Sequence, residues 1–159
     1  MIILGIDPGT YRTGFGLVQK NGNQLEHVDN GLIAPSVKFS LPEKLKKIYE
    51  SIEAMIKTFQ PKEIALEDLF FAKNAKSVLK LGHARGVVML AAAQHGIPVY
   101  EYPPTQVKQA ICGYGQATKD QIQKMVKIHL KLKEVAEENA SDALAVALCH
   151  CQTKRFLKK

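Results

Sequence analysis

The sequence predicts an α/β fold, in which a mixed five-stranded sheet is flanked by helices. A short apolar run at 2–6 ends at an Asp-Pro-Gly turn, as a buried strand does. Two further strand-like segments, 12–19 and 24–34, are joined across an Asn-Gly turn, which predicts an antiparallel three-stranded meander. From residue 41 onward, helical segments alternate with short strands, which indicates that the last two strands are parallel ones.

The second part of the chain begins with a helical segment at 41–59, whose apolar residues recur every three or four positions. Pro61 ends this helix. A short strand at 64–66 follows, and a long helix is then expected at 74–95, with Asn74 as its N-cap. The remaining predicted elements, in chain order, are a strand at 97–102, helices at 119–130 and 140–151, and a basic, flexible tail at 154–159.

Length and composition fit a single globular domain, which we expect to span residues 1–153. The chain has 159 residues, of which 46% are hydrophobic and 23% charged, enough to bury one core. Its formal net charge of +7 and its pI near 9.3 favour a polyanionic partner such as nucleic acid. A basic surface that merely keeps the protein soluble has the same composition, so the charge alone leaves both interpretations open.

We expect a cytoplasmic protein with no membrane partner. The first residues lack the basic region and the cleavage site of a signal peptide, and no apolar run approaches the roughly 20 residues that span a bilayer. The three cysteines, Cys112, Cys149 and Cys151, are odd in number and have no framework spacing, which fits a reducing compartment. Cys149 and Cys151, with His150 between them, do not make a complete zinc set.

Three acidic residues are candidates for an active site. Asp7 ends the first predicted strand, Glu67 follows the fourth, and Asp142 lies in the first turn of the last helix. Functional groups of such sheets gather beyond the carboxyl ends of the strands, and carboxylates suit hard cations such as Mg²⁺ or Mn²⁺. Two such ions could promote phosphodiester hydrolysis. Taken singly, an Asp before Pro-Gly often only shapes a turn, and acids at helix starts often serve the helix dipole.

Several short blocks resemble those of the RuvC family of Holliday junction resolvases, in the family's order and with similar spacing over nearly the whole chain. The blocks are Ile-Asp-Pro-Gly-Thr at 6–10 with Thr-Gly-Phe-Gly at 13–16, Ala-Leu-Glu at 65–67 with Phe-Phe-Ala-Lys-Asn-Ala at 70–75, Leu-Gly-His-Ala-Arg-Gly-Val at 81–87, Gln-Val-Lys-Gln at 106–109 with Gly-Tyr-Gly at 113–115, and Ser-Asp-Ala-Leu-Ala-Val-Ala at 141–147.

The resemblance implies a ribonuclease-H-like fold and a bacterial homodimer that acts in recombination and repair. Each subunit would cut one of two opposed strands of a four-way DNA junction, using Mg²⁺, with two ions per active site. Asp7, Glu67 and Asp142 align with the family's metal ligands. Partner proteins that move the branch point are also implied by the resemblance.

Asn139 stands at a fourth aligned position, where the family usually carries Asp or, in some members, His. Asparagine keeps an oxygen but has no charge and cannot act as a base, so we expect it to weaken a divalent-metal site. Either the protein tolerates the change, or the chain is an inactivated variant. On this interpretation, Asn139→Asp raises Mg²⁺-dependent cleavage.

Further residues are candidates for contact with DNA or with a second subunit. By resemblance, Lys108 and Lys119 both lie near the scissile phosphate or bind the backbone, and Lys119 is also a catalytic candidate. Phe70 aligns with a family residue that engages bases at the junction centre. Gly82 and Gly86, four residues apart on one helix, permit close helix approach and fit a dimer contact. The remaining candidates for DNA binding are Arg12, Thr13, Lys73, Lys76 and Lys80, although solvated surface charge is the commoner role of such residues.

Two other classes of function compete with a nuclease. The block at 6–10 also resembles the first phosphate loop of actin-like and sugar-kinase-like ATP-binding proteins, but these need two such domains and the chain has room for one. The second rival is a DNA-binding module that recognises junctions without cutting them. It predicts junction affinity with no cleavage in Mg²⁺ or Mn²⁺.

Overall fold

The computed structural model describes residues 1–68 and 75–156, with side chains described as far as residue 153. In chain order, the elements are β1 (Ile2–Asp7), β2 (Thr13–Asn21), β3 (Gln24–Ile33), α1 (Leu41–Phe59), β4 (Glu63–Glu67), α2 (Ala75–Gln94), β5 (Val99–Tyr102), α3 (Pro104–Cys112), α4 (Lys119–Leu130) and α5 (Glu138–Phe156).

The five strands form one mixed sheet with the order β3-β2-β1-β4-β5. β1, β2 and β3 pair antiparallel, as the hairpin signal predicts. β1 and β4 pair parallel, and so do β4 and β5. The predicted mixed five-stranded sheet is therefore confirmed, and its central strand is β1.

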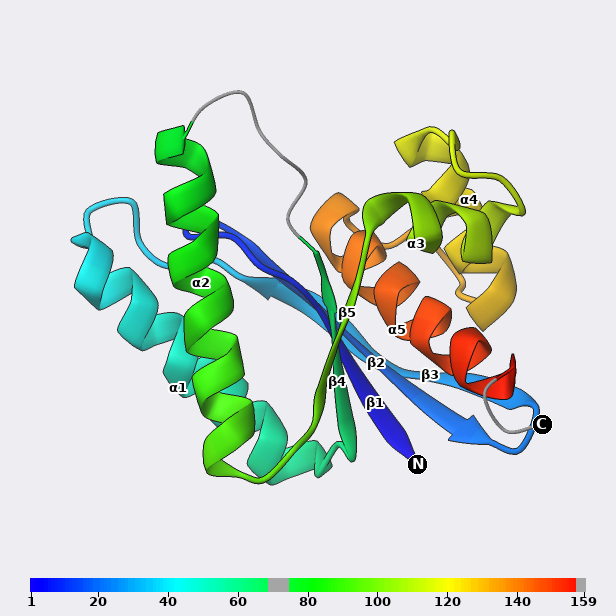
Figure 1. Cartoon of the computed structure of the whole chain (residues 1–159), viewed down its shortest axis with the longest axis horizontal. Coiled ribbons are helices and arrows are strands. Elements are labelled where there is room, and N and C mark those ends of the chain that lie inside the picture. The colour runs from blue at the N-terminus through cyan, green and yellow to red at the C-terminus, as the bar shows by residue number, and fades with distance from the viewer. Residues whose placement is uncertain (69–74, 157–159) are drawn as a thin grey trace.

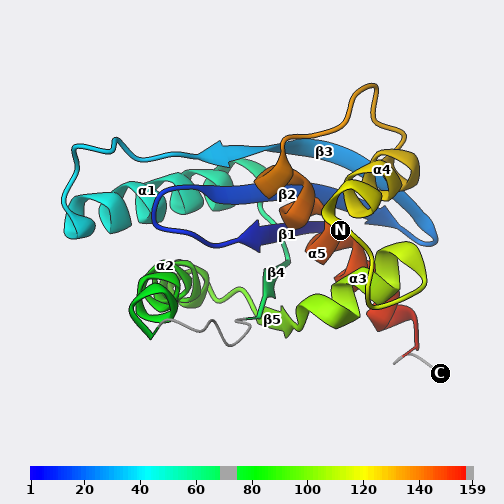
Figure 2. The ribbon, with the colours of Figure 1, turned by 90° about the horizontal axis from the view of Figure 1, so that it is seen from above.

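The helices cover both faces of the sheet. α1 and α2 lie on one face, and α3, α4 and α5 lie on the other (Figures 1 and 2). Because successive residues of a strand point to opposite faces, β1 serves two cores. Leu4 and Ile6 pack with α1 and α2, whereas Ile3 packs with the layer of α3, α4 and α5.

Glycines in β1 and β2 let α5 lie directly against the sheet. A Cβ atom built on Gly5 would stand 2.0 Å from the carbonyl oxygen of Ala143, and one on Gly14 would stand 2.0 Å from that of Asn139. Side chains other than hydrogen are thus excluded at these positions. The close contact fixes the height of α5 above the sheet, and with it the place of Asp142 at the start of the helix.

A buried polar chain ties α5 to β4 and β5. His150 is fully buried, its Nδ1 lies 2.6 Å from the Tyr102 hydroxyl, and its Nε2 lies 2.6 Å from Glu63 Oε2. Burial raises the pKa of Tyr102 to about 12, so this phenol stays protonated. His150 is therefore a structural residue of the core. Its neighbours Cys149 and Cys151 are buried free thiols.

The structure adds one helix that the sequence did not predict. α3 occupies 104–112, with Pro104 in its first turn and Gly113 ending it at a φ of 86°. α5 starts two residues before the predicted segment and continues to Phe156, five residues beyond it. The predicted N-cap Asn74 lies outside the described residues, and the flexible tail at 154–159 stays a prediction. Among the described residues, no helix has the length and apolar character to cross a membrane.

Gly5→Ala is expected to lower the free energy of unfolding by about 3 kcal/mol or more, since the new methyl group meets backbone and the core is already dense. Urea denaturation followed by circular dichroism measures the change. Gly115→Ala is the matched control, because a Cβ at Gly115 makes only an ordinary contact, 3.6 Å from the carbonyl oxygen of Thr105. Equal stabilities of the two variants would contradict the role of Gly5 as a contact point for α5.

Candidate active site

The three predicted acids line one cavity at the carboxyl end of the parallel strands. Ile6 of β1 is in register with Leu66 of β4, so the residues that follow them, Asp7 and Glu67, end neighbouring strands. Asp142 reaches the same place from α5. The cavity has a volume of about 260 Å³, and its lining consists of Asp7, Glu67, Pro104, Val107, Lys108, Lys119, Ile122, Asp142 and Ala145.

Burial and the negative charges of neighbouring carboxylates make the acids of this cluster hard to ionise. Desolvation, followed by the charges of Glu67 and Asp142, raises the pKa of Asp7 to about 8. Desolvation and the charge of Asp142 raise the pKa of Glu67 to about 7. The pKa of Asp142 is also raised by burial, although Lys119 opposes the shift. A bound cation would offset both the cost of desolvating these carboxylates and the repulsion between them.

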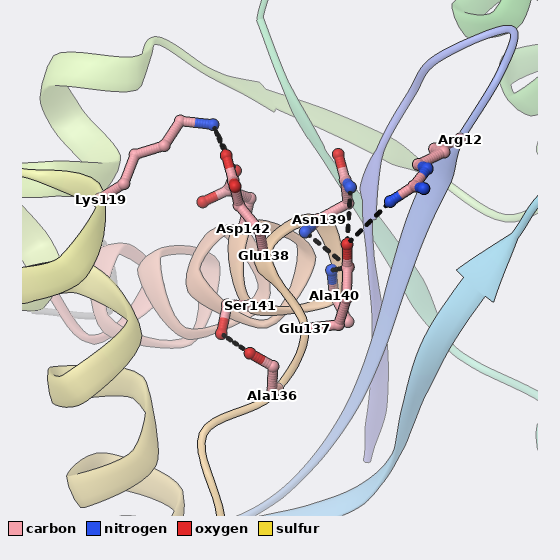
Figure 3. Close-up of polar contacts among 9 residues, drawn as sticks. All are labelled: Arg12, Lys119, Ala136, Glu137, Glu138, Asn139, Ala140, Ser141 and Asp142. Atoms are coloured by element: carbon pink, nitrogen blue, oxygen red, sulfur yellow. Dashed lines mark hydrogen bonds and ion pairs between the residues drawn. The ribbon is translucent and has the colours of Figure 1, made fainter.

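Two lysines, Lys108 and Lys119, supply positive charge to the cavity. Lys119 Nζ lies 3.5 Å from Asp142 Oδ2 and also donates to Glu138 Oε1, as Figure 3 shows. The hydrogen bond to Glu138 is the main reason why the pKa of Lys119 is raised. The charges of Lys119 and, to a lesser extent, Lys108 oppose the rise in the pKa of Glu67. Both lysines therefore stand where a phosphate entering the cavity would meet them.

The donor set fits a hard divalent cation without forming a closed cage. Within 1–68 and 75–153, no three side chains of His, Cys, Asp or Glu are arranged to hold one metal ion among them. Mg²⁺ is commonly bound by one or two carboxylates, with water and substrate phosphate completing its shell. Asp7, Glu67 and Asp142 offer oxygen ligands of that kind from three sides of one cavity.

Asn139 is not part of the cavity lining. It lies in the first turn of α5, and its side-chain amide donates to Glu137 Oε1 at 3.0 Å. The structure therefore brings together Asp7, Glu67, Asp142 and Lys119 of the five predicted catalytic residues and leaves Asn139 to one side.

The predicted DNA-binding residues occupy different environments. Arg12 is exposed, with its Nη1 3.7 Å from Glu137 Oε1. Thr13 is buried, and its hydroxyl donates to the carbonyl oxygen of Gly9 at 2.7 Å, so this side chain shapes the turn after β1. Lys76 and Lys80 lie in the first turns of α2, with Lys80 Nζ 5.7 Å from the ring centre of Tyr11. Phe70 and Lys73 lie outside the described residues.

Gly82 and Gly86 lie on an outward side of α2. A Cβ atom at either glycine would meet nothing within 4 Å. Leu79 and Leu90 on the same helix are 65% and 53% exposed. This part of α2 is therefore open and partly apolar, and neither glycine is needed for contact within the subunit.

Arg85 supports the site and was not singled out among the sequence-based candidates. Its side chain is only 9% exposed, and its Nη2 pairs with Glu101 and lies 3.6 Å from Asp68 Oδ1. Its Nη1 donates to the backbone carbonyl of Glu67 at 2.6 Å. Arg85 thus fixes the end of β4 from the face opposite α5. The signal in the sequence is an arginine between Ala84 and Val88, on the buried side of a helix.

A mixed five-stranded sheet, with acids at the ends of two parallel strands and on the helix packed across them, defines a ribonuclease-H-like α/β domain. The family model described as crossover junction endodeoxyribonuclease RuvC matches residues 3–150, and the chain belongs to that family.

Similar proteins agree with this assignment. A crossover junction endodeoxyribonuclease RuvC of Citrifermentans bemidjiense is 53% identical over 96% of this chain and 93% of its own length. The protein of the same name from Syntrophotalea carbinolica is 55% identical over 94% of this chain and 93% of its own. The structure of T. thermophilus RuvC in complex with a Holliday junction substrate superposes with a TM-score of 0.93 and 35% identity, over 98% of this chain and 96% of that one.

The raised carboxylate pKa values predict how stability depends on pH in the absence of metal. Asp7, with a pKa of about 8 in the folded protein against its ordinary 3.8, retains its proton on folding between pH 4 and 8, where the unfolded chain has lost it. Stability therefore falls as the pH rises through this range. Asp7→Asn should flatten the fall, with a gain of several kcal/mol at pH 8.

Urea denaturation in EDTA at several pH values measures this slope. Asp120→Asn is the control, since Asp120 lies on the surface, where it pairs with Lys124. A slope that is the same in the wild type and in the Asp7→Asn variant would contradict a repulsive cluster at the site.

Arg85→Gln is expected to lower the free energy of unfolding by about 2–4 kcal/mol, because it takes a donor from the partly buried carbonyl of Glu67 and removes a buried cation beside two carboxylates. Arg12→Gln, the same change at an exposed ion pair, is expected to cost less than about 1 kcal/mol. Urea titration compares the two. Similar losses would show that Arg85 does not hold the end of β4.

Proposed function

We propose that the chain is a structure-specific endonuclease that resolves four-way, or Holliday, DNA junctions in recombination and repair. The cavity carries this proposal: carboxylates from β1, β4 and α5 meet two lysines in one basic protein. The membership of the RuvC family and the likeness to a relative whose structure contains a Holliday junction substrate support the choice of DNA junctions.

Mg²⁺, with Mn²⁺ as a substitute, would be held by Asp7, Glu67 and Asp142, two ions to a site. When bound, such ions stabilise charge on the phosphate and activate the attacking water. The carboxylates supply negative oxygen ligands, and their raised pKa values mean that they would release protons on loading. Lys119 keeps Asp142 oriented, and with Lys108 it would neutralise the phosphate that enters.

The rest of the DNA contact would rest mainly on charge. Arg12, Lys76 and Lys80 are cations that phosphates of the junction arms could reach. Phe70 is proposed to stack on unpaired bases at the junction centre, and Lys73 to bind the backbone beside it; both stay predictions from the sequence. Because Thr13 is buried, we assign it to support of the turn that carries Arg12.

A homodimer is proposed to contact through α2. The exposed Leu79 and Leu90 would be covered there, and Gly82 and Gly86 would allow the two helices to approach closely. Two subunits related by two-fold symmetry offer two active sites for two opposed strands. The relatives are bacterial, and we infer that the protein acts in the cytoplasm, beside the branch-migration proteins that the family resemblance implies.

The test is cleavage of an end-labelled four-way junction and of a linear duplex with the same sequences, in Mg²⁺ and in EDTA. The wild type is expected to nick the junction at symmetric points on two opposed strands, in Mg²⁺ only, and to leave the duplex intact. Asp7→Asn should lower the rate by at least about a hundredfold while the junction affinity stays within about threefold, because it removes a ligand of the ions.

Three other results would each overturn part of the proposal. Junction binding without nicking in Mg²⁺ or Mn²⁺ would indicate a silent recognition module. Nicks on a single strand would contradict paired active sites in a dimer. ATP binding without affinity for the junction would favour the kinase-like alternative.

A further inference from the structure

The start of α5 is held by an unusual arrangement of two neighbouring side chains. Glu137 immediately precedes the helix, and its Oε2 accepts hydrogen bonds from the backbone N–H groups of Asn139, at 2.8 Å, and Ala140, at 3.2 Å. Its Oε1 accepts from the side-chain amide of Asn139 at 3.0 Å. Figure 3 shows the carboxylate folded back over the first turn.

Glutamate is not among the favoured N-cap residues, which are Ser, Thr, Asp and Asn. Its longer side chain has more freedom to leave the helix end, so something must hold it in place. The Asn139 amide does so, because Nδ2 is a donor directed at the second carboxylate oxygen, Oε1, which accepts no backbone hydrogen bond at the helix start. An aspartate at 139 would be acceptor-only when ionised, and it would place a second negative charge against Glu137.

The first turn of α5 also has little freedom to shift. The carbonyl oxygen of Asn139 lies against Gly14, where a Cβ would come within 2.0 Å. Asp142 stands one turn further along and meets Lys119 at 3.5 Å. Any change in how the helix starts is therefore transmitted to a carboxylate of the cavity.

We propose that Asn139 is a positioning residue: through Glu137 it fixes the first turn of α5, and so it holds Asp142 in the cavity. Arg12, in the turn after β1, forms an ion pair with the same carboxylate, with its Nη1 3.7 Å from Glu137 Oε1. The amide is thus matched to its neighbour, and position 139 in this chain is not a damaged metal ligand. The link to catalysis rests on the proposed function, whereas the link to the helix start does not.

This inference reverses the expectation drawn from the sequence alone. If Asn139 were only a weakened ligand, Asn139→Asp would accelerate cleavage whatever residue stood at 137. If it positions Glu137, the same substitution opposes two carboxylates about 3 Å apart, at the separation given by the present hydrogen bond. The variant should then be less stable and slower.

A double-mutant cycle tests the pair with four full-length proteins: the wild type, Asn139→Asp, Glu137→Gln and the double variant. Each is measured for its melting temperature in EDTA and for its single-turnover rate on the junction in Mg²⁺. Asn139→Asp is expected to lower the melting temperature by about 4 °C and the rate by roughly tenfold, since small misplacements of catalytic groups are costly.

The double variant should regain most of both losses, because the glutamine amide introduced at 137 can donate to the carboxylate introduced at 139 and restore the bond with its direction reversed. The control is Glu134→Gln, an equal change of charge at an exposed glutamate that lines a separate groove beside β3. It is expected to leave both values unchanged.

Faster cleavage by Asn139→Asp at an unchanged melting temperature would overturn the proposal, and so would additive effects of the two substitutions on melting. If the wild type nicks no junction at all, the proposed function fails by itself. The melting temperatures of the cycle would still decide whether Asn139 holds Glu137.

Discussion

The close packing of α5 on the glycines of β1 and β2 is the constraint on which the site depends. Gly5 and Gly14 bring the helix backbone almost into contact with the sheet. α5 therefore starts beside the end of β1 and delivers Asp142 to the cavity of Asp7 and Glu67. The same helix carries the buried His150 to its partners Tyr102 and Glu63, so the helix is held at both ends.

The cavity holds carboxyl groups in a place where their ionised form is disfavoured. Three acids are held in a partly buried space, where the charges of Glu67 and Asp142 disfavour ionisation of Asp7 and the charge of Asp142 disfavours ionisation of Glu67. The fold tolerates this because β1 and β4 are adjacent parallel strands, so that their ends cannot separate, and because Arg85 holds the end of β4 from behind. Residues at a functional site often oppose stability in this way, with the surrounding structure supplying the compensation.

Local sequence patterns were sufficient to predict most of the fold and the acids that line the candidate site. The Asn-Gly hairpin, the apolar strands and the acids that follow them depend on neighbours in the sequence. The sheet confirms the predicted strands, and the three acids line one cavity. α3 was not predicted because it is short and starts at Pro104, which also suits a turn. The hydrogen bonds of Arg85 and Asn139 could not be inferred, since each depends on which atoms the folded backbone places within hydrogen-bonding distance.

The directions of β1 and α5 leave Met1 and the described end of α5 remote from the cavity. The Met1 amine donates to the carbonyl of Lys20 at the far end of β2, and the Lys20 ammonium donates to the carbonyl of Cys151 near the end of α5. The strand runs toward the acids and the helix runs away from them. An affinity tag or fluorescent fusion attached at Met1 would therefore extend from the side of the molecule away from the cavity, and an immobilised copy would leave the cavity accessible.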